Sequence, residues 1–124
     1  MAYDNLGFTK SIKSTNNLFT SRQQYYFVSI DSSGQAIVCS HTGSYAIGVV
    51  QDTPSAGDPA QICGPGAITK VYCAGTITPG QFVMTNGSGQ ALAATSSSHI
   101  LGVALTAGAN GYLCDILFQP MGTI

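Results

Sequence analysis

A repeated stretch of sequence constrains this chain of 124 residues more than any other feature. Residues 27–37 (FVSIDSSGQAI) align with residues 82–92 (FVMTNGSGQAL) at a constant offset of 55, and six of the eleven positions are identical. In both copies an apolar run is followed by a Gly-centred turn and a second apolar run, which is typical of a β-hairpin. The chain is therefore predicted to contain the same hairpin twice.

Further matches follow the hairpins in the same order, with offsets that fall from 54 to 51. They are Ile47-Gly48-Val49 with Leu101-Gly102-Val103, Ala56-Gly57 with Ala107-Gly108, and Ile62-Cys63 with Leu113-Cys114. Because the order is preserved, we predict two related units, residues 27–63 and 82–114, joined by residues 64–81 and packed around a common core.

From Gln24 onward, short runs of β-branched and aromatic residues alternate with turns rich in Gly, Pro, Asn and Asp. Such runs favour strands, and no apolar period is long enough for a stable helix. Nine short strands separated by turns are typical of a sandwich or a barrel. We predict an all-β domain over residues 24–124, a small sandwich or barrel with two related halves. The expected strands are residues 25–30, 35–40, 45–51, 60–63, 67–73, 82–85, 90–94, 99–105 and 112–118.

Residues 1–23 differ in composition, with three of the four basic residues of the chain and scattered aromatic residues in a Ser-, Thr- and Asn-rich sequence. We predict an extended N-terminal arm that contacts another chain, with a frayed terminus as the alternative. The expected contact residues are Phe8, Lys10, Lys13, Phe19 and Arg22.

Charged residues make up only 7% of the chain, against about 25% in an average soluble domain. The net charge of −1 gives no electrostatic basis for binding nucleic acid or an anionic membrane. A neutral Ser-, Thr- and Tyr-rich surface is easily desolvated, which suits permanent contacts and favours an obligate assembly. No apolar stretch reaches the ~20 residues of a membrane span, and the N-terminus lacks the apolar segment of a signal peptide, so we expect synthesis in a cytoplasm.

The sequence offers little for catalysis or for a cofactor. It has no G-x-S-x-G, no Walker A motif and no G-x-G-x-x-G, and its five acidic residues are all Asp. Cys39 and His41 would share a strand face but form at most half of a metal site. Tyr25, Tyr26 and Tyr45 could stack on sugars, although strand aromatics usually serve cores and interfaces. We therefore predict no enzyme activity, no metal and no cofactor.

The four cysteines, Cys39, Cys63, Cys73 and Cys114, include no C-x-x-C pair, which excludes the common zinc and redox motifs. Three disulfide connectivities are possible, and four buried reduced thiols are the alternative. Cys63 and Cys114 end matched segments of the repeat, so they are expected at matched places. We favour thiols or bridges between subunits over a bridge within the chain.

The segment from Ala46 to Phe118 resembles the capsid decoration, or cement, proteins of tailed bacteriophages of the DUF2190 type. The resemblance covers roughly 70 residues and rests on an ordered set of motifs, each weak by itself. The matching stretches are Ile47-Gly48-Val49, Ala56-Gly57-Asp58, residues 74–83 (AGTITPGQFV), Asn86 to Gln90, residues 100–105 (ILGVAL) and Gly111 to Leu117. Residues 1–45, Gln81 in place of an Asp of the family pattern, and the four cysteines depart from it.

This resemblance implies a β-tulip-like sandwich or barrel, homotrimers on the exterior of the capsid, and no catalysis. The expected function is decoration of a phage head, in which the protein binds the major capsid protein and stabilises its lattice. The expected location is the virion, after synthesis in the host cytoplasm. The alternative is a module on the virion exterior that binds a glycan or a host surface.

Overall fold

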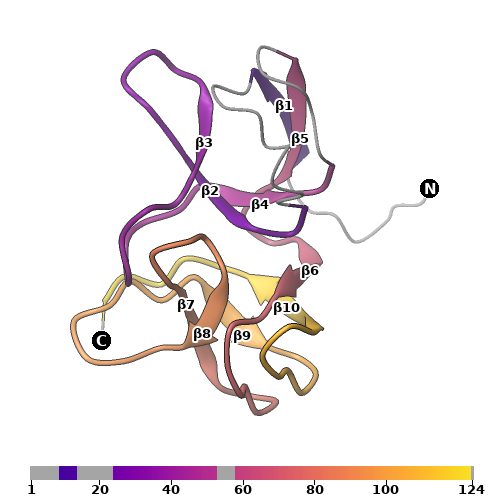
Figure 1. Ribbon diagram of the computed structural model, residues 1–124, viewed down its shortest axis with the longest axis vertical. Coiled ribbons are helices and arrows are strands. Elements are labelled where there is room, and N and C mark those ends of the chain that lie inside the picture. Colours follow the sequence, from indigo (N-terminus) through magenta and orange to yellow (C-terminus); the bar gives the residue numbers. More distant parts are fainter. Residues whose placement is uncertain (1–8, 14–23, 53–57, 124) are drawn as a thin grey trace.

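The computed structural model describes residues 9–13, 24–52 and 58–123, and within them every regular element is a β-strand. Among these described residues, no helix is long and apolar enough to cross a membrane. The strands form two antiparallel sheets of five, one above the other in Figure 1. The all-β prediction is confirmed, and all nine predicted strands are present. Seven are shorter than predicted, the strand at 82–85 has the predicted bounds, and the strand predicted at 60–63 begins one residue earlier.

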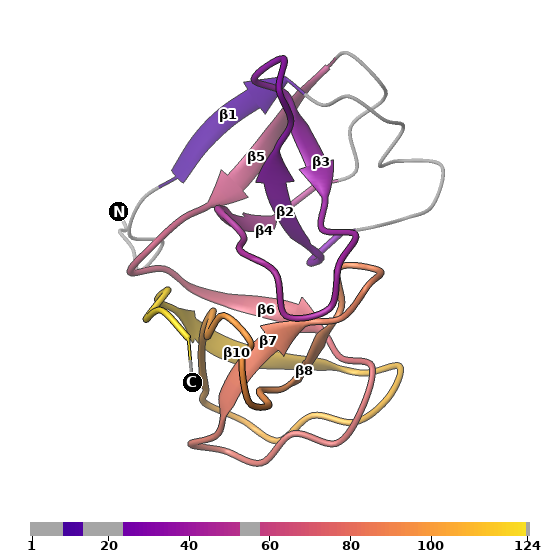
Figure 2. The ribbon, with the colours of Figure 1, turned by 90° about the vertical axis from the view of Figure 1, so that its left-hand side faces the viewer.

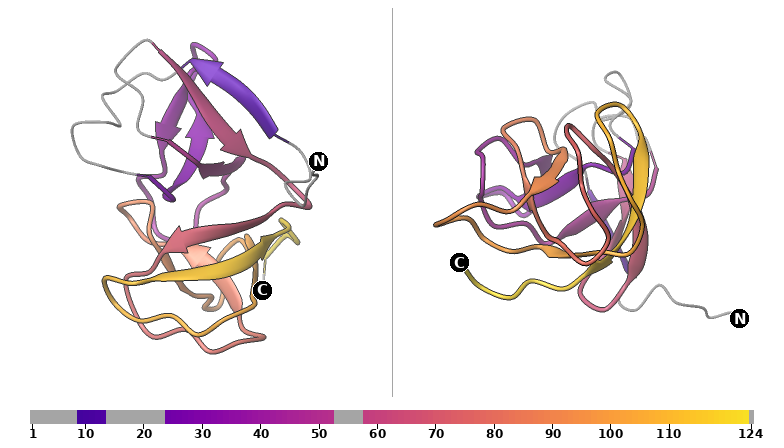
Figure 3. Two further views of the ribbon diagram at one scale, coloured as in Figure 1. Left: turned by 90° about the vertical axis from the view of Figure 1, so that its right-hand side faces the viewer. Right: turned by 90° about the horizontal axis from the view of Figure 1, so that it is seen from below.

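The two sheets have the same strand order. In the first, β1-β5-β4-β2-β3, the strands are β1 (Thr9–Lys13), β2 (Phe27–Ile30), β3 (Ala36–Val38), β4 (Gly48–Val50) and β5 (Pro59–Cys63). In the second, β6-β10-β9-β7-β8, they are β6 (Ile68–Tyr72), β7 (Phe82–Thr85), β8 (Ala91–Ala93), β9 (Gly102–Ala104) and β10 (Leu113–Phe118). Each strand of the first sheet has a counterpart five strands later, so the prediction of two related halves is confirmed. Figures 2 and 3 show the two sheets from the sides and from below.

The repeat is longer than the sequence predicted. β1 pairs with β5 as β6 pairs with β10, so each unit begins one strand earlier than the matched hairpin. Residues 64–81 are predicted to join the units and to include a strand at 67–73. That strand is β6, and it is the first strand of the second unit. At equivalent positions the sequence of β1 (TKSIK) shares no identical residue with that of β6 (ITKVY), which is why the alignment missed it.

Strand pairing also corrects the last part of the alignment. Val49 pairs with Cys63, and its counterpart Val103 pairs with Leu117, so the offset between β5 and β10 is 54 rather than 51. The counterpart of Cys63 is therefore Leu117, and the counterpart of Cys114 is Ala60. The predicted match of Cys63 with Cys114 is wrong, because a shared apolar-Cys dipeptide does not determine register, whereas backbone pairing does. The proposed match of Ala56-Gly57 lies outside the described residues.

Two glycines show why the apolar-Gly-Val motif recurs. A Cβ on Gly48 would overlap the carbonyl oxygen of Cys63, and a Cβ on Gly102 would overlap that of Leu117. These two carbonyls are counterparts at offset 54, so both halves bring neighbouring strands equally close. Only glycine has the space for this approach.

The hairpin turns are equivalent as well. Gly34 and Gly89 both have positive φ, +80° and +83°, which favours glycine. The Asp31 Oδ1 atom accepts the N–H groups of Ser33 and Gln35, both at 2.9 Å. Asn86 Oδ1 does the same for Ser88 and Gln90, at 2.8 and 2.9 Å.

Each half has an apolar core made by matching positions, and the second core extends into the first half. The inward residues are Val28, Ala36, Val50, Ala60 and Ile62 in the first half, and Val83, Ala91, Ala104, Cys114 and Ile116 in the second. The second core also takes in Phe27 and Val49, and the rings of Phe27 and Phe118 lie 6.2 Å apart. The two halves are therefore packed on one another through Phe27.

Candidate interaction surface

The structure places two of the predicted arm residues in a sheet. Lys10 and Lys13 lie in β1, where they pair with Ile62 and Pro59 of β5 at the edge of the first sheet. Residues 9–13 are thus extended, and their backbone is bound within the chain. Phe8, Phe19 and Arg22 lie outside the described residues, and contact of the arm with another chain stays a prediction.

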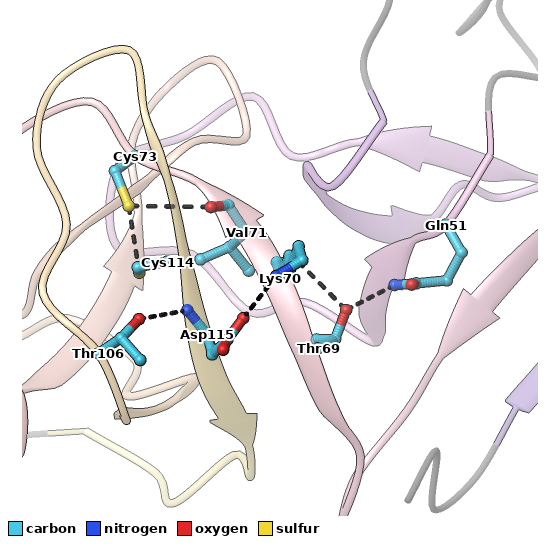
Figure 4. A network of polar contacts seen from close by, with 8 residues as sticks. All are labelled: Gln51, Thr69, Lys70, Val71, Cys73, Thr106, Cys114 and Asp115. Atoms are coloured by element: carbon cyan, nitrogen blue, oxygen red, sulfur yellow. Dashed lines mark hydrogen bonds and ion pairs between the residues drawn. The ribbon is translucent and has the colours of Figure 1, made fainter. Parts of the chain in front are cut away.

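All four cysteines are buried thiols. Cys73, directly after β6, and Cys114 of β10 are brought together with their sulfur atoms 3.2 Å apart (Figure 4). The Cys39 sulfur instead lies 3.6 Å from the Tyr45 carbonyl oxygen. An added Cβ on Gly108 would lie 2.7 Å from the Cys73 sulfur, so the loop before β10 covers this pair closely. Bridges between subunits stay a prediction for the assembled protein.

Burial raises the pKa of two of these thiols. The Cys39 pKa rises to about 11, although hydrogen bonds from Ser44 and Ser29 oppose the effect of burial. The Cys114 pKa rises to about 12, first through burial and then through its hydrogen bond with Cys73. Since the thiolate is the reactive form, both groups are neutral and unreactive near pH 7.

Tyr26 and Tyr45, both considered for sugar binding, lie in different surroundings. Tyr26 packs against Tyr72 at a ring distance of 5.5 Å, and its hydroxyl accepts a hydrogen bond from Gln90 at 3.0 Å. This partly buried residue therefore lies between the halves. Tyr45 is exposed and meets His99 edge-on at 6.4 Å. The His41 ring contacts Ser40, and no three His, Cys, Asp or Glu side chains gather as a metal site in the part that the structure describes.

An exposed apolar row crosses the outer face of the second sheet. Direct cross-strand pairs join Ile68 to Leu117, Leu117 to Val103, and Val103 to Phe82. Paired residues of an antiparallel sheet project to the same face. Ile68 and Phe82 are 43% and 44% exposed, and Val103 and Leu117 are half-buried. We call these four residues the second-sheet row.

The equivalent row of the first sheet is covered. Pairing joins Cys63 to Val49 and Val49 to Phe27, and these residues are the counterparts of Leu117, Val103 and Phe82. All three are 0% exposed. We call them the first-sheet row. The same row of the same fold is thus buried in one half and open in the other.

The polar groups beside the second-sheet row leave it nearly neutral. Lys70 and Asp115 pair across β6 and β10, with Nζ 3.2 Å from Oδ1, and the Asp115 N–H donates to the Thr106 hydroxyl at 2.9 Å (Figure 4). On the opposite face of β6, Gln51 of the first half donates to the hydroxyl of the buried Thr69 at 2.8 Å. Exposed ion pairs contribute ~0–1 kcal/mol, so the apolar side chains dominate what this face can bind. The second-sheet row is therefore suited to contact with another apolar surface.

The second-sheet row could not be predicted from the sequence. Phe27 and Phe82 are the same residue type at the same place of the repeat, so no local signal separates the buried one from the exposed one. The pairing of Ile68 with Leu117 depends on the β6–β10 register, which was not predicted from the sequence. A correct β6–β10 register would have placed these four residues in one row, but it would not have shown that the row is exposed.

Comparison with known proteins finds the same fold in a phage structural protein. No protein-family model matches the chain and no curated protein matches it, so the resemblance to the DUF2190 type stays a prediction. Among solved structures, the chain is similar to the head fiber gp8.5 N base of bacteriophage phi29, with a TM-score of 0.70 and 16% sequence identity. The alignment covers 94% of this chain and 97% of that one, so the two share the fold over nearly their whole lengths.

Proposed function

We propose that this protein decorates the exterior of a phage head, where it binds the major capsid protein and stabilises the capsid lattice as a homotrimer. It is made in the host cytoplasm and joins the particle there. The observation that carries the proposal is the fold shared over 94% of the chain with a protein of a phage head fiber. A structural role on the outside of a virion follows most simply from that likeness.

The surface supports the same role. The second-sheet row presents apolar side chains from all four neighbouring strands β6, β10, β9 and β7, and burying one large apolar side chain contributes ~1.5–3 kcal/mol. A cement protein repeats each modest contact over a whole lattice, so avidity multiplies its effect. Such a protein requires contact area rather than a catalytic group. The proposal accordingly assigns it no enzymatic step, no metal and no cofactor, and no nucleic acid or membrane as partner.

Reconstitution tests this function. Purified protein is mixed with heads that lack it, and the heads are sedimented and their protein composition quantified. The proposal predicts saturable binding at a fixed ratio to the major capsid protein. Absence of binding to heads, together with binding to host cells or to an array of glycans, would instead establish the alternative of a host-surface module.

A further inference from the structure

The two halves of the chain contact each other through surfaces that are not counterparts. The first half contributes the first-sheet row and β2, and the second half contributes core residues such as Phe118 together with its hairpin turn. The Phe27 N–H donates to the Gly89 carbonyl at 2.7 Å, and the Gly43 N–H donates to the Thr85 carbonyl at 2.8 Å. Gly89 is held so closely that an added Cβ would lie 2.5 Å from Val38 Cγ1. The contact is therefore head to tail, not twofold.

The row and the hairpin turn recur in the other half and both recurrences are open, whereas the first-half counterparts of the second core are buried. On the outer row, Phe82 is 44% exposed where Phe27 is 0%. At the hairpin, Ile30 is 39% exposed where its counterpart Thr85 is 0%, and a Cβ added to Gly34 would meet nothing within 4 Å. A closed twofold between the halves would have used both pairs of surfaces. A single chain thus carries one unused row and one unused hairpin edge.

We propose that a second copy of this chain covers these two unused surfaces. The second-sheet row of one copy binds the hairpin edge of the next copy, which is formed by Ile30 and residues 31–35. This contact continues the interface that already joins the halves. It rests on the self-association in the proposed function and names the surface that makes it. The counterpart of the bond from Phe27 to Gly89 joins the Phe82 N–H of one copy to the Gly34 carbonyl of the next.

The backbone around Phe82 has the same hydrogen-bond pattern as the backbone around Phe27. The Phe82 carbonyl accepts the Ala94 N–H at 2.9 Å, as the Phe27 carbonyl accepts the Cys39 N–H at 3.0 Å. The Val83 and Val28 carbonyls likewise accept from the counterparts Leu101 and Ile47, at 2.8 and 2.9 Å. The two strands therefore present the same edge geometry to a hairpin. Head-to-tail contacts close into rings when the rotation permits, and a ring of three agrees with the proposed homotrimer.

Substitutions in the second-sheet row and in the hairpin edge test the contact, and the mass of the assembly in solution is the measurement. Phe82→Asp and Ile30→Asp each place a charge in the proposed interface, and Tyr112→Asp is the control, because Tyr112 is the most exposed large apolar side chain and lies outside both surfaces. Sedimentation equilibrium should give assembled wild type and Tyr112→Asp protein, and monomers for the other two. Wild-type protein that is monomeric at every concentration, or Phe82→Asp protein that keeps the wild-type mass, overturns the inference.

A photo-crosslinking amino acid at position 82 tests the contact without relying on a variant that could misfold. Light and heavy isotope-labelled protein are mixed before irradiation, so that crosslinks between copies are recognised by mass. Crosslinks from position 82 to residues 30–35 of another copy are expected. Crosslinks only to other segments, or only to the major capsid protein in particles, overturn the inference.

The outcome separates this inference from the proposed function. Protein that assembles through Phe82 and does not bind heads supports the inference and contradicts the function. Protein that decorates heads as a monomer supports the function and contradicts the inference.

Discussion

At the scale of single residues, two glycines determine how closely the strands can approach. Because a Cβ on Gly48 or Gly102 would overlap a carbonyl of the neighbouring strand, Gly48→Ala and Gly102→Ala should each lower the free energy of unfolding by ~3 kcal/mol or more. Gly87→Ala is the control, since its Cβ would make ordinary contacts at 3.7 Å. Urea unfolding measures all three. Equal stabilities for Gly102→Ala and Gly87→Ala would show that the strands are not so close.

Because of the buried thiols, the free energy of unfolding should fall as the pH rises in the alkaline range. Their ordinary pKa is 9.0, and burial raises it to about 11 in Cys39 and about 12 in Cys114. The neutral thiols therefore stabilise the fold fully below about pH 9, and this contribution is lost as the pH rises towards those values. In reductant, the urea midpoint of the wild type should fall more between about pH 8 and about pH 10.5 than that of Cys39→Ala. Parallel pH profiles would contradict this.

At the scale of elements, the two hairpin turns are close structural copies in different surroundings. Asp31→Ala and Asn86→Ala each remove an oxygen that accepts two backbone N–H groups, which should cost ~1 kcal/mol or more. Asn86→Ala should cost more, because the adjacent Gly89 is packed between the halves. Asn86→Asp keeps the accepting oxygen and serves as the control. Equal losses at both turns in thermal unfolding would argue against the asymmetric packing of the halves.

Because β1 lies within residues 1–23, truncating the predicted arm should affect the stability of the first sheet. Removing residues 1–23 also removes β1 and its whole ladder with β5, so it should lower the melting temperature, whereas removing residues 1–8 leaves β1 in place. Circular dichroism during heating compares the two truncations. If both melt like the full chain, β1 contributes nothing to the sheet. Loss of head binding by the shorter truncation would support the predicted contact of the arm.

The elements also show what sequence alone could determine. Alternation and turn residues were enough for the nine strands from β2 to β10 and for the repeated hairpin, because these signals are local. β1 was missed, since its polar sequence TKSIK resembles the rest of the arm and becomes a strand only through pairing with β5. The Cys63–Cys114 match failed because register is determined between strands, and the exposure of Phe82 depends on how whole halves pack.

At the scale of the whole molecule, packing of the halves head to tail leaves an apolar row open on a chain with few charges. This is the feature of the structure that most favours a protein built for assembly. Together with the fold of a phage head fiber base, this row supports the proposed role on the capsid exterior. The proposed role is mechanical: the bound protein would hold the capsid lattice together against internal pressure.

Release of DNA from heated heads tests that claim most directly. Heads carrying the protein, heads stripped of it, and stripped heads to which it has been added back are heated in parallel, and released DNA is followed with a dye. The account predicts that decorated and restored heads release their DNA at a higher temperature than stripped heads. Release at the same temperature from all three would contradict the claim that this protein stabilises the capsid.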